Sequence, residues 1–146
     1  MRVKCLPLFL LLALAVGCSS SGAKESPGKP ALRIAQSAPL FFGSGFSAPL
    51  NVNVDISNVA KEPIRVRRVR LEPGGGQNQY NIYPHSRIVS ETIQPGETKT
   101  LYVALTAYTD IRRLQPTEPL GMRAIIDYEF GGTRYQGYYI FLQIDQ

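Results

Sequence analysis

The chain has 146 residues, a formal net charge of +5, one histidine and two cysteines. This length predicts a single domain that can bury enough surface to be stable without disulfide bonds. One histidine and two cysteines cannot supply the several ligands of an ordinary zinc site, so the composition argues against one.

The first eighteen residues have the order of a signal peptide. Arg2 and Lys4 precede an apolar run at residues 6–16, and small residues lead from there to Cys18. The run is shorter than the ~20 residues that a membrane-spanning helix needs, so we expect a signal, residues 1–17, that is removed. Removal takes away two of the 16 basic residues and none of the 11 acidic ones, which leaves a net charge of +3 and Cys18 as the single cysteine.

The residues before the expected cleavage point resemble those of bacterial lipoprotein precursors. The family prefers leucine, a small residue, glycine or alanine, then cysteine; here Ala15, Val16 and Gly17 precede Cys18. The resemblance implies lipid on Cys18 and a membrane anchor in the bacterial cell envelope. Ser19 is not the aspartate that favours inner-membrane retention in enterobacterial lipoproteins, which implies the periplasmic face of the outer membrane. The alternative is an ordinary secretory signal.

The segment after the signal has the composition of a linker. Residues 18–30 are rich in serine, glycine, proline and lysine, without apolar periodicity. They predict a flexible tether, which as a coil would span about 20 Å on average. The folded domain is then expected at residues 31–146, close to the membrane.

Most of the remaining chain has the period of β-strands. Residues 50–57 alternate between apolar and polar side chains without a fault, which predicts a strand with one buried face. We expect further strands at residues 32–34, 80–83, 87–93 and 101–105, with Pro84 dividing the second from the third.

The strand expected at residues 64–71 changes its parity halfway. Its first two apolar side chains and its last two would face opposite sides. One extra residue at Arg67 or Arg68 restores a common face, as in a β-bulge. The alternative is a strand that bends from one sheet to the other.

Two connections have distinct sequences. Pro95 and Gly96 predict a tight turn over residues 94–97, because proline presets the first corner and glycine permits the positive φ of the second. Residues 107–119 predict a long connection, in which Asp110 could cap one short helical turn.

The last two strands predict a hairpin. Residues 122–130 alternate up to Gly131 and Gly132, a two-residue loop that suits the strand twist. Pairing the residues that flank this loop places Glu129 opposite Arg134 and apolar residues opposite one another, which supports the register. The last strand is apolar on its outer side too, which favours a central position in the sheet or a covering loop; its outer apolar residues are Tyr138, Ile140, Leu142 and Ile144.

About seven strands with no strong helix predict an all-β, antiparallel β-sandwich. Over residues 31–146 the layout resembles immunoglobulin-like domains, although the Cys-Trp-Cys core of true immunoglobulin domains is absent. Residues 50–105, with a Pro-Gly turn leading into Thr-Leu-Tyr-Val-Ala-Leu, also resemble the water-stress (LEA type 2) β-sandwich. The Asn-Pro of that family is missing here.

The sequence contains no motif for catalysis. His85 is the single histidine, and no Gly-x-Ser-x-Gly pattern supplies a nucleophile for it. We therefore expect no catalytic residue, metal or cofactor, and read His85 as a loop residue. The alternative is an enzyme with a site near His85, Tyr80 and Tyr83.

Four arginines in six positions are the sharpest functional feature. Arginine binds phosphate and carboxylate groups in a bidentate manner, so they predict binding to an anionic lipid, lipopolysaccharide or an acidic envelope protein. Export makes nucleic acid an unlikely partner. The alternatives are a solvated strand face, or charges that protect an edge strand from aggregation. The four are Arg65, Arg67, Arg68 and Arg70.

A second feature is an aromatic loop. Phe41, Phe42 and Phe46 lie among glycine and serine and could contact a partner or membrane; alternatively, they close the end of the sandwich. Together these features predict a lipid-anchored envelope protein that acts as a non-catalytic binding or structural accessory module. The alternatives are an envelope enzyme and a stress-protective surface protein.

Overall fold

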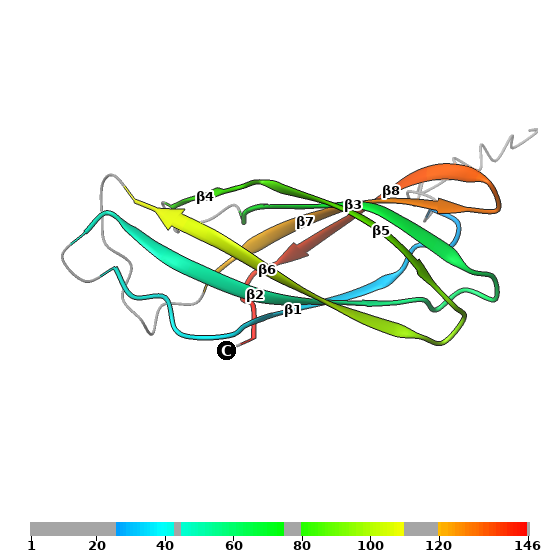
Figure 1. The fold of residues 1–146 in the computed structure, drawn as a ribbon, viewed down its shortest axis with the longest axis horizontal. Helices are drawn as coiled ribbons and strands as arrows, with labels where there is room; N and C mark the ends of the chain where they lie inside the picture. The colour runs from blue at the N-terminus through cyan, green and yellow to red at the C-terminus, as the bar shows by residue number, and fades with distance from the viewer. Residues whose placement is uncertain (1–25, 43–44, 75–79, 110–119, 146) are drawn as a thin grey trace, which may run out of the picture.

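The computed structural model describes residues 26–42, 45–74, 80–109 and 120–145. Eight strands run along an elongated sandwich (Figure 1). No helix in the described part is long and apolar enough to span a membrane. The strands are β1 (Ala31–Gln36), β2 (Ser47–Ser57), β3 (Ile64–Pro73), β4 (Asn81–Tyr83), β5 (Ser86–Ile93), β6 (Thr98–Tyr108), β7 (Met122–Phe130) and β8 (Thr133–Phe141).

The strands form two four-stranded sheets. Sheet A has the order β1-β2-β6-β4, and sheet B has the order β5-β3-β7-β8. Every pair of neighbouring strands is antiparallel. The predicted all-β, antiparallel β-sandwich is therefore confirmed, with eight described strands rather than about seven.

The core lies between the inner faces of the two sheets. The alternating strand predicted at residues 50–57 forms most of β2, and its apolar side chains are at most 1% exposed. From sheet B, Val66, Ile126 and Tyr128 are equally buried. Alternation thus decides which side chains enter the core, because successive residues of a strand face opposite sides.

The predicted β-bulge is present in β3. Against β7, the register shifts between Val66 and Arg68, which leaves Arg67 as the extra residue. Against β5, the register shifts at the same place, but the extra residue there is on β5, because Val89 and Ser90 lie opposite Arg67. The alternative of a strand that changes sheets is wrong for β3, since all of it pairs within sheet B. The change occurs instead at Pro84, because β4 belongs to sheet A and β5 to sheet B.

Both predicted turns have the expected geometry. The Glu97 N–H donates to the Gln94 carbonyl at 3.0 Å, and Gly96 has a φ of 76°. Gly131 and Gly132 have φ values of 54° and 78°, as a primed two-residue hairpin turn requires. The predicted hairpin register is confirmed over the whole length of β7 and β8.

The prediction of a central position for the last strand is wrong. β8 is an edge strand of sheet B. Tyr138, Ile140 and Leu142 are 59%, 72% and 85% exposed, so no described loop covers them. Ile144, the fourth residue of that set, is buried beyond the end of the strand.

Residues 26–30, which we call the strap, pack against the β7–β8 hairpin. The Tyr128 hydroxyl donates to the Pro27 carbonyl at 2.9 Å, and the Lys29 ammonium lies 4.8 Å from the ring centre of Tyr139. Gly28 has a φ of 64° and leaves no room for a side chain, because a Cβ there would lie 2.3 Å from the Phe130 ring. The last five residues of the expected tether therefore contact the sandwich.

Three sequence predictions lie outside the described residues. They are the signal at residues 1–17, the lipidation site Cys18 with the tether up to residue 25, and the helical turn at Asp110.

Candidate functional site

The four arginines belong to a central strand. β3 lies between β5 and β7, so the interpretation that they protect an edge strand is wrong. Its core-facing residues are apolar, and the residues between them face outward. Neighbouring strands add two more outward arginines, so the outer face of sheet B, here called the arginine face, carries Arg65, Arg67, Arg68, Arg70, Arg123 and Arg134.

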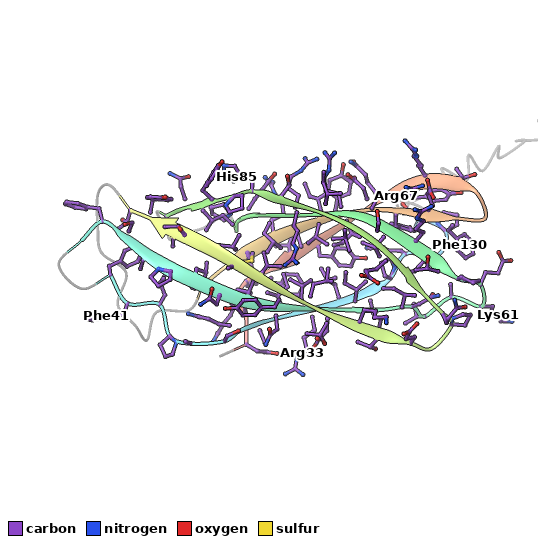
Figure 2. All side chains as sticks on the ribbon, in the orientation of Figure 1. Arg33, Phe41, Lys61, Arg67, His85 and Phe130 are labelled. Atoms are coloured by element: carbon purple, nitrogen blue, oxygen red, sulfur yellow. The ribbon has the colours of Figure 1, made fainter. Side chains whose placement is uncertain are left out.

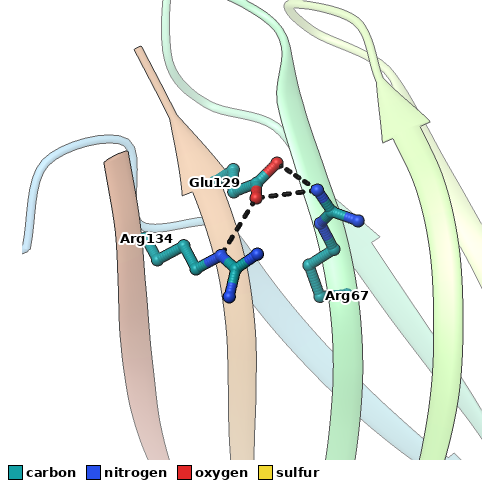
Figure 3. A network of polar contacts seen from close by, with 3 residues as sticks. All are labelled: Arg67, Glu129 and Arg134. Carbon is teal, nitrogen blue, oxygen red and sulfur yellow. Dashed lines mark hydrogen bonds and ion pairs between the residues drawn. The ribbon is translucent and has the colours of Figure 1, made fainter. Parts of the chain in front are cut away.

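One carboxylate holds two of these arginines together (Figure 3). Arg67 Nη2 donates to both carboxylate oxygens of Glu129 at 2.8 Å, and Arg134 Nε donates to Glu129 Oε1 at 3.2 Å. These bonds, first that of Arg67, hold the pKa of Glu129 below its ordinary value. The network joins β3, β7 and β8, and the bulge lets the consecutive residues Arg67 and Arg68 both face away from the core.

The other arginines are paired less closely or not at all. Arg68 Nε lies 3.9 Å from Asp127 Oδ2, and Arg123 Nε donates to Glu72 at 2.9 Å. Neither Arg65 nor Arg70 has an acidic partner among the described residues. The arginine face therefore has six arginines and three carboxylates, Glu72, Asp127 and Glu129, and keeps an excess of positive charge.

A groove of about 730 Å³ crosses the arginine face near the β7–β8 hairpin. Ile88, at its rim, is 78% exposed. Arg67 Nε is buried without a hydrogen-bond partner among the described atoms. The groove thus combines arginine guanidinium groups with the exposed apolar side chain of Ile88. Its lining consists of Arg67, Arg68, Ile88, Ser90, Asp127, Tyr128, Arg134, Tyr135 and Gln136.

The aromatic loop divides between core and surface. Phe42 is 5% exposed and belongs to the core, so its assignment as a contact residue is wrong. Phe41 and Phe46 are 69% and 63% exposed. Figure 2 shows Phe41 at one end of the sandwich and Arg67 towards the other end. Both interpretations of the loop therefore hold in part, and its exposed aromatics are remote from the groove.

Tyr80 and Tyr83, the residues named with His85 for an enzyme site, have different surroundings. The Tyr80 hydroxyl donates to the Gly121 carbonyl at 2.6 Å, and burial raises the pKa of Tyr80 to about 12. Tyr83 meets His85 edge to face, with ring centres 6.3 Å apart. A cavity of about 240 Å³ is lined by His85, Ser86 and their neighbours. The described residues hold no group of three or more potential metal ligands from His, Cys, Asp and Glu.

Sequence reasoning missed two parts of the groove. The link between Arg67 and Glu129 depends on which strand lies beside β3, and residues 62 positions apart give no local signal of it. Ile88 lies in the strand expected at residues 87–93, and its outward exposure follows only from the sheet order. The signal that points to an acidic partner is the hairpin register, which places Glu129 opposite Arg134.

The described part of the chain defines an all-β sandwich with a cationic groove on one outer face. Among solved structures, it is similar to the structural-genomics target SoR45, with a TM-score of 0.50 and 8% identity over 79% of this chain and 87% of that one. This likeness shows the fold alone.

Two further structures match less well. A protein from Archaeoglobus fulgidus has a TM-score of 0.43 and 11% identity, covering 75% of this chain and 90% of that one. A FixG-related protein from Vibrio parahaemolyticus has a TM-score of 0.39 and 12% identity, covering 79% and 96%. No protein family and no curated protein matches the sequence.

Proposed function

We propose that the protein is a lipid-anchored lipoprotein of the bacterial cell envelope that acts as a non-catalytic binding or structural accessory module. The observation that carries the binding role is the arginine face. Three arginines and the exposed Ile88 are among the residues that line its groove. Exposed patches of that mixed kind are typical of interaction sites.

The anchor is supported by the order of residues before Cys18 and by the strap. A basic start, a short apolar run and small residues precede this cysteine. The strap fixes the described chain from Ser26 onward, so eight residue steps separate the proposed lipid from the sandwich. The module would be held close to the periplasmic face of the outer membrane.

Membrane fractionation tests the anchor. The Cys18→Ala precursor should be released by a detergent-free wash at high salt, which also weakens contacts between arginines and lipid headgroups, whereas a Ser19→Ala control should stay with the membrane like the wild type. Unchanged fractionation of Cys18→Ala would overturn the anchoring.

A pull-down from solubilised envelope tests the accessory role. We expect an envelope component in stoichiometric amount with the wild type, and its loss with Arg68→Gln/Arg134→Gln. Arg33→Gln/Lys99→Gln removes the same charge from sheet A and should retain that component. Equal capture by all three proteins would contradict a role for the arginine face.

The small cavity beside His85 and Ser86 is the one observation that favours the enzyme alternative. Any measured activity should then disappear in His85→Ala and persist in Arg68→Gln/Arg134→Gln. The opposite pattern would favour the binding module.

A further inference from the structure

The groove on the arginine face has both arginines and exposed apolar side chains beside it, and two of the arginines are loosely held. Among the described residues, Arg68 is held only by a distant carboxylate, 3.9 Å away, and the Arg134 side chain is 83% exposed although it contacts Glu129. Both guanidinium groups can therefore turn towards a ligand phosphate, which the arginine fork binds well. A phosphate in the groove would also balance the excess positive charge of this face.

Exposed apolar side chains lie on the same sheet as these arginines. Ile88 lines the groove itself. Tyr138 and Ile140 on β8, and Leu142 directly after it, are also exposed. A small dissolved anion would use the arginines and leave the apolar residues in water. A lipid surface would use both, because headgroups meet the charges while apolar side chains enter the interface.

The strap begins beside the groove. Ser26 Oγ lies 3.5 Å from the Gln136 carbonyl oxygen, and Tyr128 donates to Pro27. Gln136 and Tyr128 both line the groove. Cys18 is eight residue steps upstream, which as a coil span about 16 Å and at full extension about 27 Å. The chain therefore leaves the sandwich at the end where the groove lies.

We propose that the arginine face lies on the bilayer, with the phosphate of an anionic phospholipid headgroup bound in the groove by Arg68 and Arg134. A bilayer is preferred over an acidic protein as the partner of this face because the face also carries exposed apolar residues. The inference uses the lipid anchor of the proposed function only for the direction of the tether. Headgroup binding itself requires no lipid on Cys18.

Vesicle flotation of the mature chain, residues 18–146 with Cys18→Ala, tests headgroup binding separately from anchoring. The probes are vesicles of phosphatidylcholine alone and vesicles with phosphatidylglycerol as three lipids in ten (composition about 7:3). We expect flotation only with the anionic vesicles, and weaker binding as salt rises. Equal flotation with both vesicles, or none with either, would overturn the proposal while leaving the Cys18 fractionation result unaffected.

Two charge variants locate the binding. Arg68→Gln/Arg134→Gln keeps the Arg67–Glu129 pair and should weaken vesicle binding about 25-fold, since each basic residue at an anionic surface contributes about a fivefold effect. Arg33→Gln/Lys99→Gln removes two charges from sheet A and should change binding less than about twofold. Equal weakening would mean that net charge, and not this face, binds the vesicles, which would overturn the proposal.

An apolar variant separates a bilayer from a soluble phosphate ligand or an acidic protein. Ile88→Ser should weaken vesicle binding several-fold, whereas Tyr102→Ser, which changes an exposed residue of sheet A, should not. Undiminished binding by Ile88→Ser would contradict apposition to the bilayer. Circular dichroism of each variant shows that it keeps the wild-type fold, and the matched control gives the effect of a surface substitution alone.

Discussion

The outer faces of the two sheets have the same backbone pattern and very different chemistry. On sheet A, Asn51 and Asn53 occupy outward positions of β2. Its charges are internally satisfied, because Arg33 donates to Asp145 at 2.7 Å and the Asp55 carboxylate accepts from Thr100 at 2.6 Å. Sheet B instead gathers six arginines around three carboxylates.

This difference separates what folds the domain from what it could bind. The long central strands β2 of sheet A and β3 of sheet B both bury one side, so folding alone gives no reason for an excess of arginine on one outer face. Function resides in sites placed on a fold, and the face whose charges are not balanced within the protein is the better candidate. Substitutions on one outer face, or where the two sheets are joined, test this difference when each is compared with a control substitution at a matched position.

The largest effect is expected where the two sheets are joined. Asn58 is 1% exposed, and its amide donates to the carbonyls of Glu62 and Ile93, both at 2.9 Å. Asn58→Ala should lower the free energy of unfolding by about 3 kcal/mol, because two buried carbonyls lose their donor. Urea denaturation measures this loss.

The matched variant for that link is Asn53→Ala, which removes an amide from the outer face of sheet A. It should change the free energy of unfolding by less than about 0.5 kcal/mol, as surface substitutions usually do. Similar losses at both positions would mean that Asn58 does not join the sheets.

Features that depend on neighbouring residues could be predicted from the sequence. The hairpin register follows from alternation across a two-residue loop, and the bulge at Arg67 follows from a parity change inside one strand. Both are local patterns. Because alternate residues of each strand must face the core, few other strand registers are possible.

Features that depend on distant partners could not be predicted. The strap has the composition of a linker, and its order comes from Tyr128, about 100 residues later. The exposure of Ile140 was missed because the apolar pattern of β8 does not tell which strand, if any, lies beside it. The arginines were found, but their pairing with Glu129 required the order of sheet B.

The strap is the next most sensitive point, because it holds the end of the sandwich beside the groove. Gly28→Ala should lower the free energy of unfolding by about 2 kcal/mol, through a positive φ and a clash with the Phe130 ring. Gly96→Ala shares the positive φ but has open space around its Cβ, so it should cost about 1 kcal/mol. Equal urea midpoints for the two variants would contradict close packing of the strap.

A change in binding with little change in stability is expected at Glu129. Glu129→Gln releases Arg67 and Arg134 from a carboxylate and makes the arginine face more positive. Binding to the phosphatidylglycerol vesicles should strengthen about fivefold. Asp55→Asn adds the same charge change on sheet A, and there vesicle flotation should stay as in the wild type. Stronger binding by both variants would remove the distinction between the faces.

The smallest expected effect is the pH dependence of that carboxylate. Because Arg67 and Arg134 lower its pKa in the folded state, the folded protein binds fewer protons than the unfolded chain as pH falls past the ordinary value. The stabilisation is therefore complete above the unfolded pKa of 4.5, declines as pH falls through the folded pKa, and is absent below it. The difference in urea midpoint between wild type and Glu129→Gln should shrink from pH 7 to pH 3. A difference that stays constant over this range would show that the ion pairs do not stabilise the arginine face, and that Glu129 affects its charge alone.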